Sequence, residues 1–110
     1  MKDDAAIAAL AALAQEDRLA AFRLLVRAGP EGMASGDIAD TLSVAPTRMS
    51  FHLSALERGG LVKSRREGRR IYYVVCFDRM RGLLGFLTED CCGGRPEICG
   101  VEAPANTEGL

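Results

Sequence analysis

Two short amphipathic helices, joined by a three-residue turn and followed at once by a hairpin, constrain this chain more than any other feature. The first helix is expected from Ser35, which can cap it, to about Leu42. After the turn at 43–45, Pro46 can begin a second helix over 46–58, because the first residue of a helix needs no N–H donor. Apolar residues at helical spacing would pack the two helices together, which is a helix-turn-helix pattern.

A β-hairpin is expected directly after the second helix. Gly59-Gly60 ends that helix, and two strand-like segments, 61–65 and 70–75, flank a turn that contains a glycine. Further helices are expected at about 4–14, 17–28 and 78–90. The expected order is therefore four helices, two strands and a last helix, which is a mainly α fold with a small β hairpin.

The helix at 4–14 consists mostly of alanine and leucine and has little polar surface, so we expect it to be buried against a partner chain. A chain of 110 residues forms one domain near the lower end of comfortable size, and such domains often gain core by dimerising. The Gly- and Pro-containing segment 93–110 is expected to be a flexible tail that carries a cysteine. The folded domain is then expected at 1–92.

Charge is distributed unevenly along the chain and favours an anionic partner. The formal net charge is −1, but residues 46–81 hold nine basic and three acidic residues, between two acidic ends. The outer face of the second helix and the arginines of the hairpin can contact DNA phosphates and base edges. An ordinary helical hairpin with a solvated charged surface is the alternative. The residues expected to contact DNA are Thr47, Arg48, Ser50, Phe51, His52, Ser54, Arg65, Arg66, Arg69 and Arg70.

Three of the four cysteines, Cys91, Cys92 and Cys99, lie within nine residues. Thiolates are soft ligands, and three of them match the three bonds that trivalent arsenic or antimony forms with sulfur. The alternatives are zinc with a fourth ligand from a carboxylate or water, thiol–disulfide exchange, and an incidental cluster. The fourth cysteine, Cys76, is expected to be a small buried apolar residue.

Other classes of protein fit the sequence less well. No run of 18 apolar residues is present, and Asp3 and Asp4 argue against a signal peptide, so we expect a cytoplasmic location with reduced thiols. An enzyme is not expected. The clustered cysteines follow a predicted helix C-terminus, where the helix dipole disfavours a thiolate, and the chain has no phosphate loop, catalytic triad or paired-carboxylate site.

The stretch from Leu13 to Val75 resembles the ArsR/SmtB family of metal- and metalloid-responsive repressors, above all in SFHLSALERGGLV and SRREGRRIYY. The resemblance implies a winged helix-turn-helix homodimer joined by the first and last helices. It implies a recognition helix at 46–58 and a wing at 61–75. It also implies a repressor that binds a pseudo-palindromic DNA operator and is released by an inducer.

Two inducer sites common in that family are absent from this sequence. The segment ASGDIADTL lacks the paired cysteines of many arsenic-sensing relatives, and 78–90 lacks the histidines of zinc-sensing relatives. Some arsenite-responsive members resemble this chain in having a vicinal cysteine pair and a third cysteine near the C-terminus. We therefore expect a repressor released from DNA when arsenite, As(III), or antimonite binds the three cysteines. The alternative is a zinc-, cadmium- or redox-responsive repressor that uses the same cysteines.

Overall fold

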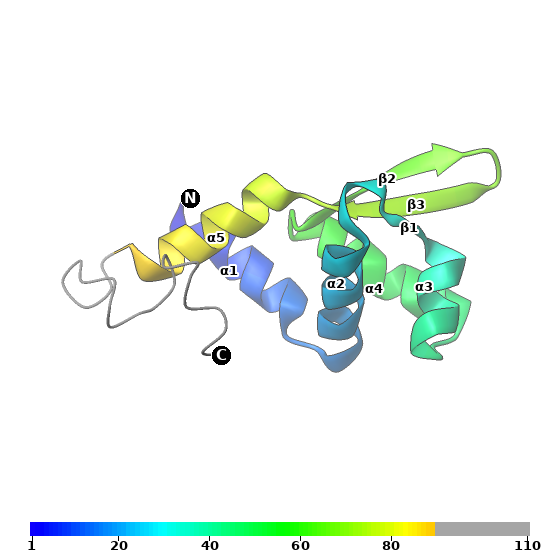
Figure 1. Ribbon diagram of the computed structural model, residues 1–110. Helices are drawn as coiled ribbons and strands as arrows, with labels where there is room; N and C mark the ends of the chain where they lie inside the picture. The colour runs from blue at the N-terminus through cyan, green and yellow to red at the C-terminus, as the bar shows by residue number, and fades with distance from the viewer. Residues whose placement is uncertain (90–110) are drawn as a thin grey trace, which may run out of the picture.

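The computed structural model describes residues 1–89 (Figure 1). The expected tail at 93–110 and the three clustered cysteines lie outside these residues. The elements follow one another as α1 (Asp3–Leu13), α2 (Glu16–Ala28), the 3-10 helix η1 (Gly29–Glu31), β1 (Met33–Ala34), α3 (Ser35–Leu42), α4 (Pro46–Arg58), β2 (Val62–Glu67), β3 (Arg70–Val75) and α5 (Phe77–Thr88).

The mainly α fold with a small hairpin is confirmed, with one strand more than the sequence predicts. The sheet is antiparallel and has the order β1-β3-β2, so β3 is its central strand. The added strand β1 has two residues, and Met33 pairs with Tyr73. A Cβ atom on Gly32, whose φ is +70°, would lie 2.3 Å from the carbonyl oxygen of Tyr73. Glycine therefore lets this segment approach β3 and pair with it.

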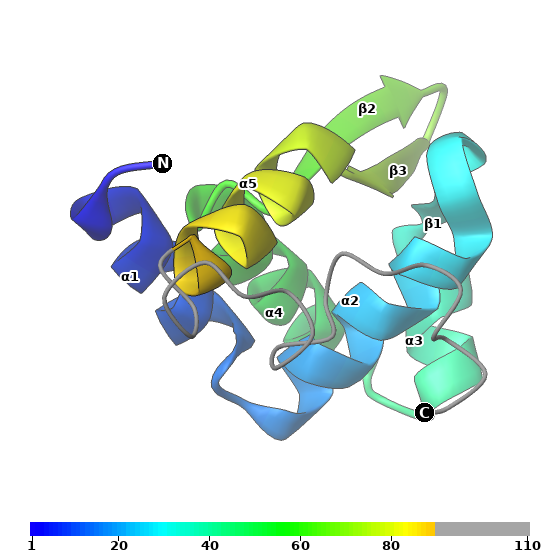
Figure 2. The same cartoon turned by 60° about the vertical axis from the view of Figure 1, so that its left-hand side comes forward.

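The core lies where α2, α3 and α4 pack together and against the sheet. Ile38 of α3, Leu25 of α2 and Met49 and Leu53 of α4 are fully buried. Along α4, buried Met49, Leu53 and Leu56 recur every three or four positions, so one face of this helix is turned to the core and the opposite face is left to other contacts. Figure 1 shows α1 and α5 together at one end of the molecule and the β2–β3 hairpin reaching away from them, and Figure 2 shows the same arrangement from the side.

The first helix packs differently from what its leucine spacing predicts. Its buried residues are Ala6, Ala9 and Ala12, whereas Ile7 is 65% exposed and Leu10 is 42% exposed. Small side chains face inward because α1 crosses close to the end of α4, where a Cβ atom on Gly59 would lie 2.7 Å from the Cβ atom of Ala12. The larger apolar side chains of α1 consequently remain on the surface of the single chain.

Candidate nucleic-acid interface

The outer face of α4 presents most of the side chains that the sequence predicts for DNA contact. Thr47, Arg48, Ser50 and Phe51 are exposed, and Ser54 is partly buried. Because 47, 50, 51 and 54 follow helical spacing, these side chains share one face of α4. The structure therefore brings five of the six predicted α4 residues to one surface.

The prediction that His52 lies on this surface is wrong. Its side chain is 8% exposed and points toward α2, where Nε2 lies 3.6 Å from Oδ2 of Asp17. Nδ1 accepts a hydrogen bond of 3.2 Å from Nε of Arg18. Nε2, the other ring nitrogen, is the one that faces Asp17. The sequence could not indicate this burial, because the partners of His52 are about 35 residues away in the chain.

The first turn of α2 contributes to the same surface, which the sequence did not indicate. Oδ2 of Asp17 accepts a hydrogen bond of 3.1 Å from Arg48, so one carboxylate lies beside both His52 and Arg48. The guanidinium of Arg18 lies 5.7 Å from the centroid of the Phe51 ring. No local motif marks Asp17 or Arg18, because their role depends on how α2 packs on α4.

The wing is a tight hairpin, and two of its four predicted arginines contact other side chains of the protein. Its turn is Gly68-Arg69, and Gly68 adopts a φ of +64° that glycine accepts without strain. Arg65 donates to Glu67 at 2.6 Å and lies 5.2 Å from the ring centroid of Tyr72. Arg70 lies 5.7 Å from the same centroid.

Arg70 also donates to Asp37 of α3 at 2.8 Å, which attaches the wing to the first helix of the helix-turn-helix pair. Within residues 1–89, Arg66 and Arg69 are exposed and form no ion pair. Two wing arginines are therefore engaged within the protein, and Arg66 and Arg69 are available to a partner.

The base of the wing is attached to α4. Oγ of Ser64 in β2 donates a hydrogen bond of 3.0 Å to Glu57 of α4. Tyr73 of β3 is buried beneath the same helix, and this burial raises the pKa of its phenol; the charge of Glu57 acts in the same direction and a hydrogen bond with Ser54 opposes it. The phenol is thus held in its neutral form between the sheet and α4.

Comparison with known proteins agrees with this arrangement. A family model described as a helix-turn-helix domain matches residues 13–65. The nodulation protein NolR of Rhizobium meliloti is 37% identical over 89 residues, which are 79% of this chain and 70% of NolR. A solved homodimeric winged helix-turn-helix DNA-binding domain from Mycobacterium bovis, a possible ArsR-family transcriptional regulator, is 32% identical with a TM-score of 0.64. That similarity covers 84% of this chain and 91% of the other.

The chain belongs to the ArsR family of winged helix-turn-helix transcriptional regulators. The chain is also similar to the solved structure of HlyU from Vibrio cholerae, with 26% identity, a TM-score of 0.65 and coverage of 84% of this chain and 99% of HlyU. HlyU is a transcriptional activator. Because these relatives are regulators, ArsR-family membership confirms the expectation that the chain is not an enzyme.

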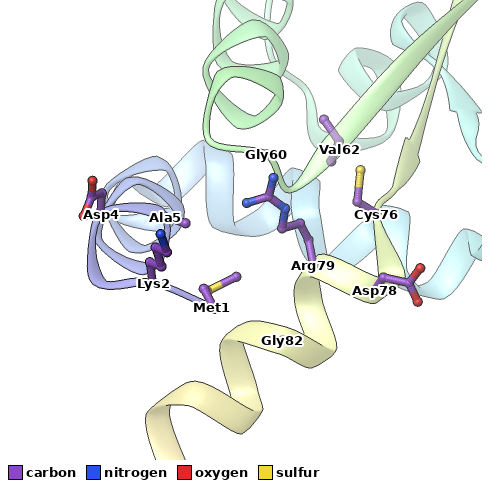
Figure 3. A pocket seen from close by; sticks show the side chains of 10 residues that line it. All are labelled: Met1, Lys2, Asp4, Ala5, Gly60, Val62, Cys76, Asp78, Arg79 and Gly82. Carbon is purple, nitrogen blue, oxygen red and sulfur yellow. The ribbon is translucent and has the colours of Figure 1, made fainter.

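An open cavity of about 950 Å³ lies between α1, α5 and the start of β2 in this ArsR-family chain (Figure 3). The side chain of Arg79 reaches across it toward Gly60. Cys76 lines the cavity and is only partly buried, whereas the sequence predicted a small buried apolar residue at this position. On α5, Leu84 and Leu87 are about half exposed. On α1, Ile7 and Leu10 are exposed as well.

The inducer site expected from the sequence lies outside the described part of this ArsR-family chain. Within residues 1–89, no three histidine, cysteine or acidic side chains come together as a metal site would require. Cys91, Cys92 and Cys99 all follow the last described residue. Among the described helices, none is long and apolar enough to cross a membrane.

Proposed function

We propose that this chain is a cytoplasmic transcriptional repressor that binds a pseudo-palindromic operator in double-stranded DNA as a homodimer. In this proposal α4 enters the major groove and the wing lies along the neighbouring backbone. The observation that carries it is the pairing of an exposed polar face on α4 with two uncommitted arginines, Arg66 and Arg69, at the tip of the wing. Two-fold symmetry would place the half-sites about 34 Å apart, one turn of DNA.

The dimer is proposed to form through α1 and α5. The exposed apolar side chains Ile7 and Leu10 of α1 and Leu84 and Leu87 of α5 lie on helices that are together at one end of the molecule (Figure 2). Exposed apolar groups of this kind mark protein–protein contacts. The homodimeric state of the Mycobacterium bovis domain supports dimer formation as such.

Selection of binding sites from a random duplex library tests DNA binding. We expect an inverted repeat, bound with a Kd of about 10⁻⁸ M or lower at physiological salt and at least about 10³-fold more tightly than scrambled DNA. The double variant Thr47→Ala, Ser50→Ala should lose most of this preference while retaining weak binding to any duplex, because phosphate contacts do not depend on sequence. Equal affinity of the wild type for operator and scrambled DNA would contradict the proposal.

For the inducer we propose trivalent arsenic, or antimony, held by Cys91, Cys92 and Cys99. The support comes from the sequence: three thiols within nine residues, in a chain that lacks the two other inducer sites common among its relatives. A coupling free energy of about 1–3 kcal/mol between the two sites would lower DNA affinity about 5- to 150-fold. Because thiolates are the ligands, binding should release protons and weaken in acid.

Titration of the operator complex with arsenite, antimonite, zinc, cadmium and peroxide tests the inducer. We expect arsenite and antimonite to release DNA from the wild type, and the triple variant Cys91→Ser, Cys92→Ser, Cys99→Ser to remain bound. Cys76→Ser is the matched control and should respond like the wild type. Release of the triple variant by arsenite would refute the site, and release by zinc, cadmium or peroxide alone would establish the alternative inducer.

A further inference from the structure

Phe51 is an apolar side chain on the otherwise polar and basic outer face of α4. It is 57% exposed, and its neighbours Thr47, Arg48 and Ser50 are exposed as well. A phenylalanine ring has no hydrogen-bonding group, so it cannot satisfy a phosphate or the donors and acceptors of base edges. To the edge of a base, this side chain can offer only an apolar contact.

The ring of Phe51 is held in place on two sides. The Phe51 and His52 rings meet in a T-shaped arrangement, with centroids 5.7 Å apart and an interplanar angle of 65°. The guanidinium of Arg18 lies over it, 5.7 Å from the centroid, within the range of a cation–π contact. An exposed ring that is ordered before binding loses less side-chain entropy when a partner covers it.

The groups that hold the ring are themselves fixed. Nε of Arg18 donates to His52 at 3.2 Å, and the backbone N–H of Arg18 donates at 3.0 Å to the side chain of Gln15, which caps α2. His52 is buried against α2. A chain of contacts therefore runs from the cap of α2 through Arg18 to both rings of α4.

We infer that Phe51 recognises a thymine in each operator half-site through the C5 methyl group, and that Arg18 and His52 are positioning residues for this contact. The inference rests on the proposed function, which places α4 in the major groove. The thymine methyl is the apolar group that base pairs present in that groove, and phenylalanine is one of the side chains that contact it. Insertion of an aromatic wedge between base pairs is a minor-groove mode and does not fit a ring on the outer face of α4.

Replacement of thymine by deoxyuracil removes only the C5 methyl group and gives a direct test. After the operator has been selected with the full-length wild-type chain, each thymine is replaced in turn and Kd is measured by fluorescence anisotropy at fixed salt. We expect one symmetric position at which deoxyuracil weakens binding about fourfold per half-site. This factor corresponds to about 0.8 kcal/mol, the contribution of one buried methyl group. In Phe51→Ala the thymine operator should bind more weakly and this thymine–uracil difference should vanish.

Two further variants separate direct contact from positioning. Thr47→Ser removes only the methyl group of Thr47, another apolar group on this face, and should keep the thymine–uracil difference. Arg18→Lys keeps the charge but loses the Nε–H donor, so we expect a reduced difference with unchanged affinity for scrambled DNA. A general loss of fold would lower both affinities together, and circular dichroism of each variant checks the fold.

The outcomes distinguish this inference from the proposed function. A selected operator in which every thymine tolerates deoxyuracil would overturn the Phe51 contact and leave DNA binding intact. Loss of the thymine–uracil difference in Thr47→Ser, but not in Phe51→Ala, would assign the methyl contact to Thr47 and also overturn it. If no sequence is selected at all, the proposed function fails and the inference fails with it.

Discussion

Nε of Arg18 in α2 lies 3.2 Å from Nδ1 of His52 in α4 and donates a hydrogen bond to it. This bond satisfies a ring nitrogen in a side chain that is 8% exposed, and it ties the proposed recognition helix to the helix behind it. Buried polar groups without such partners are costly, so the pair is part of the packing of α4 as well as of its outer surface.

Removal of the imidazole should therefore destabilise the protein. We expect His52→Ala to lower the free energy of unfolding by about 1–3 kcal/mol, because Arg18 loses its acceptor and a small cavity opens in the packing of α4. Urea unfolding at one fixed protein concentration measures the change. The exposed neighbour Ser50 is the control, and Ser50→Ala should stay within about 0.5 kcal/mol. Equal stability of the two variants would show that the Arg18–His52 bond contributes nothing.

Gly59→Ala should destabilise the packing of α1 on α4. The φ of Gly59 is −76°, which alanine accepts, so the effect comes from the new Cβ atom, 2.7 Å from Ala12 and 3.2 Å from the carbonyl oxygen of Ala8. We expect a loss of about 1–3 kcal/mol in the free energy of unfolding.

Gly36→Ala is the matched control for this steric effect. No atom lies within 4 Å of a Cβ atom at Gly36, and the position is inside α3. Alanine there should be neutral or stabilise by up to about 1 kcal/mol. A similar response of both variants would mean that helix propensity, rather than the contact with α1, decides the result.

Arg66 and Arg69 should contribute to DNA binding through charge. We expect Arg66→Gln and Arg69→Gln each to weaken binding to all DNA sequences alike and to reduce the slope of log K against log salt by about 1.8, which is about 0.9 for each protomer of the proposed dimer. Arg69→Lys keeps the charge and should keep the slope. Binding measured between about 50 and 200 mM salt provides the slope, and a change confined to one operator sequence would point instead to base recognition.

Leu87 should contribute to dimerisation. It is 52% exposed on α5, and we expect Leu87→Asp to weaken the dimer at least about tenfold, because a carboxylate would be buried without a partner at the interface. Leu19, on α2 and 46% exposed, is the matched control, and Leu19→Asp should remain dimeric. Sedimentation equilibrium measures both, and an unaffected Leu87→Asp dimer would place the interface elsewhere.

Tyr73 should make stability fall in alkali. Burial raises its pKa above the ordinary value of 10.0, so above that pH the unfolded chain ionises first and gains stability relative to the folded one. The contribution of Tyr73 is complete below pH 10.0 and is lost as pH rises through the pKa of the folded state. Tyr73→Phe should therefore flatten the decline of stability above about pH 10, and urea unfolding at a series of pH values measures it.

Local patterns in the sequence were sufficient for the elements of the fold. Helical spacing, Pro46 at the start of α4 and the glycine in the wing turn predicted the helix-turn-helix pair and the hairpin, and all are present. The strand β1 was not predicted, because two residues carry no alternation. It exists through its pairing with β3, which lies about 40 residues further along the chain.

The candidate site was predicted less completely, for reasons that lie in tertiary contacts. The sequence predicted which face of α4 is exposed. It could not show that Arg70 forms an ion pair with Asp37, or that His52 points inward to Arg18. The inward alanines of α1 were missed for a similar reason, because the close crossing at Gly59 favours small side chains over leucine.

The two-residue strand β1 has a consequence for how DNA release can work. It joins the segment before α3 to β3 of the wing, while the bonds from Arg70 to Asp37 and from Ser64 to Glu57 join the wing to α3 and α4. The helix pair and the wing are therefore joined to each other at three places. We therefore expect an inducer of the proposed dimer to act by changing how the two protomers sit relative to each other, rather than by moving the wing away from its helices.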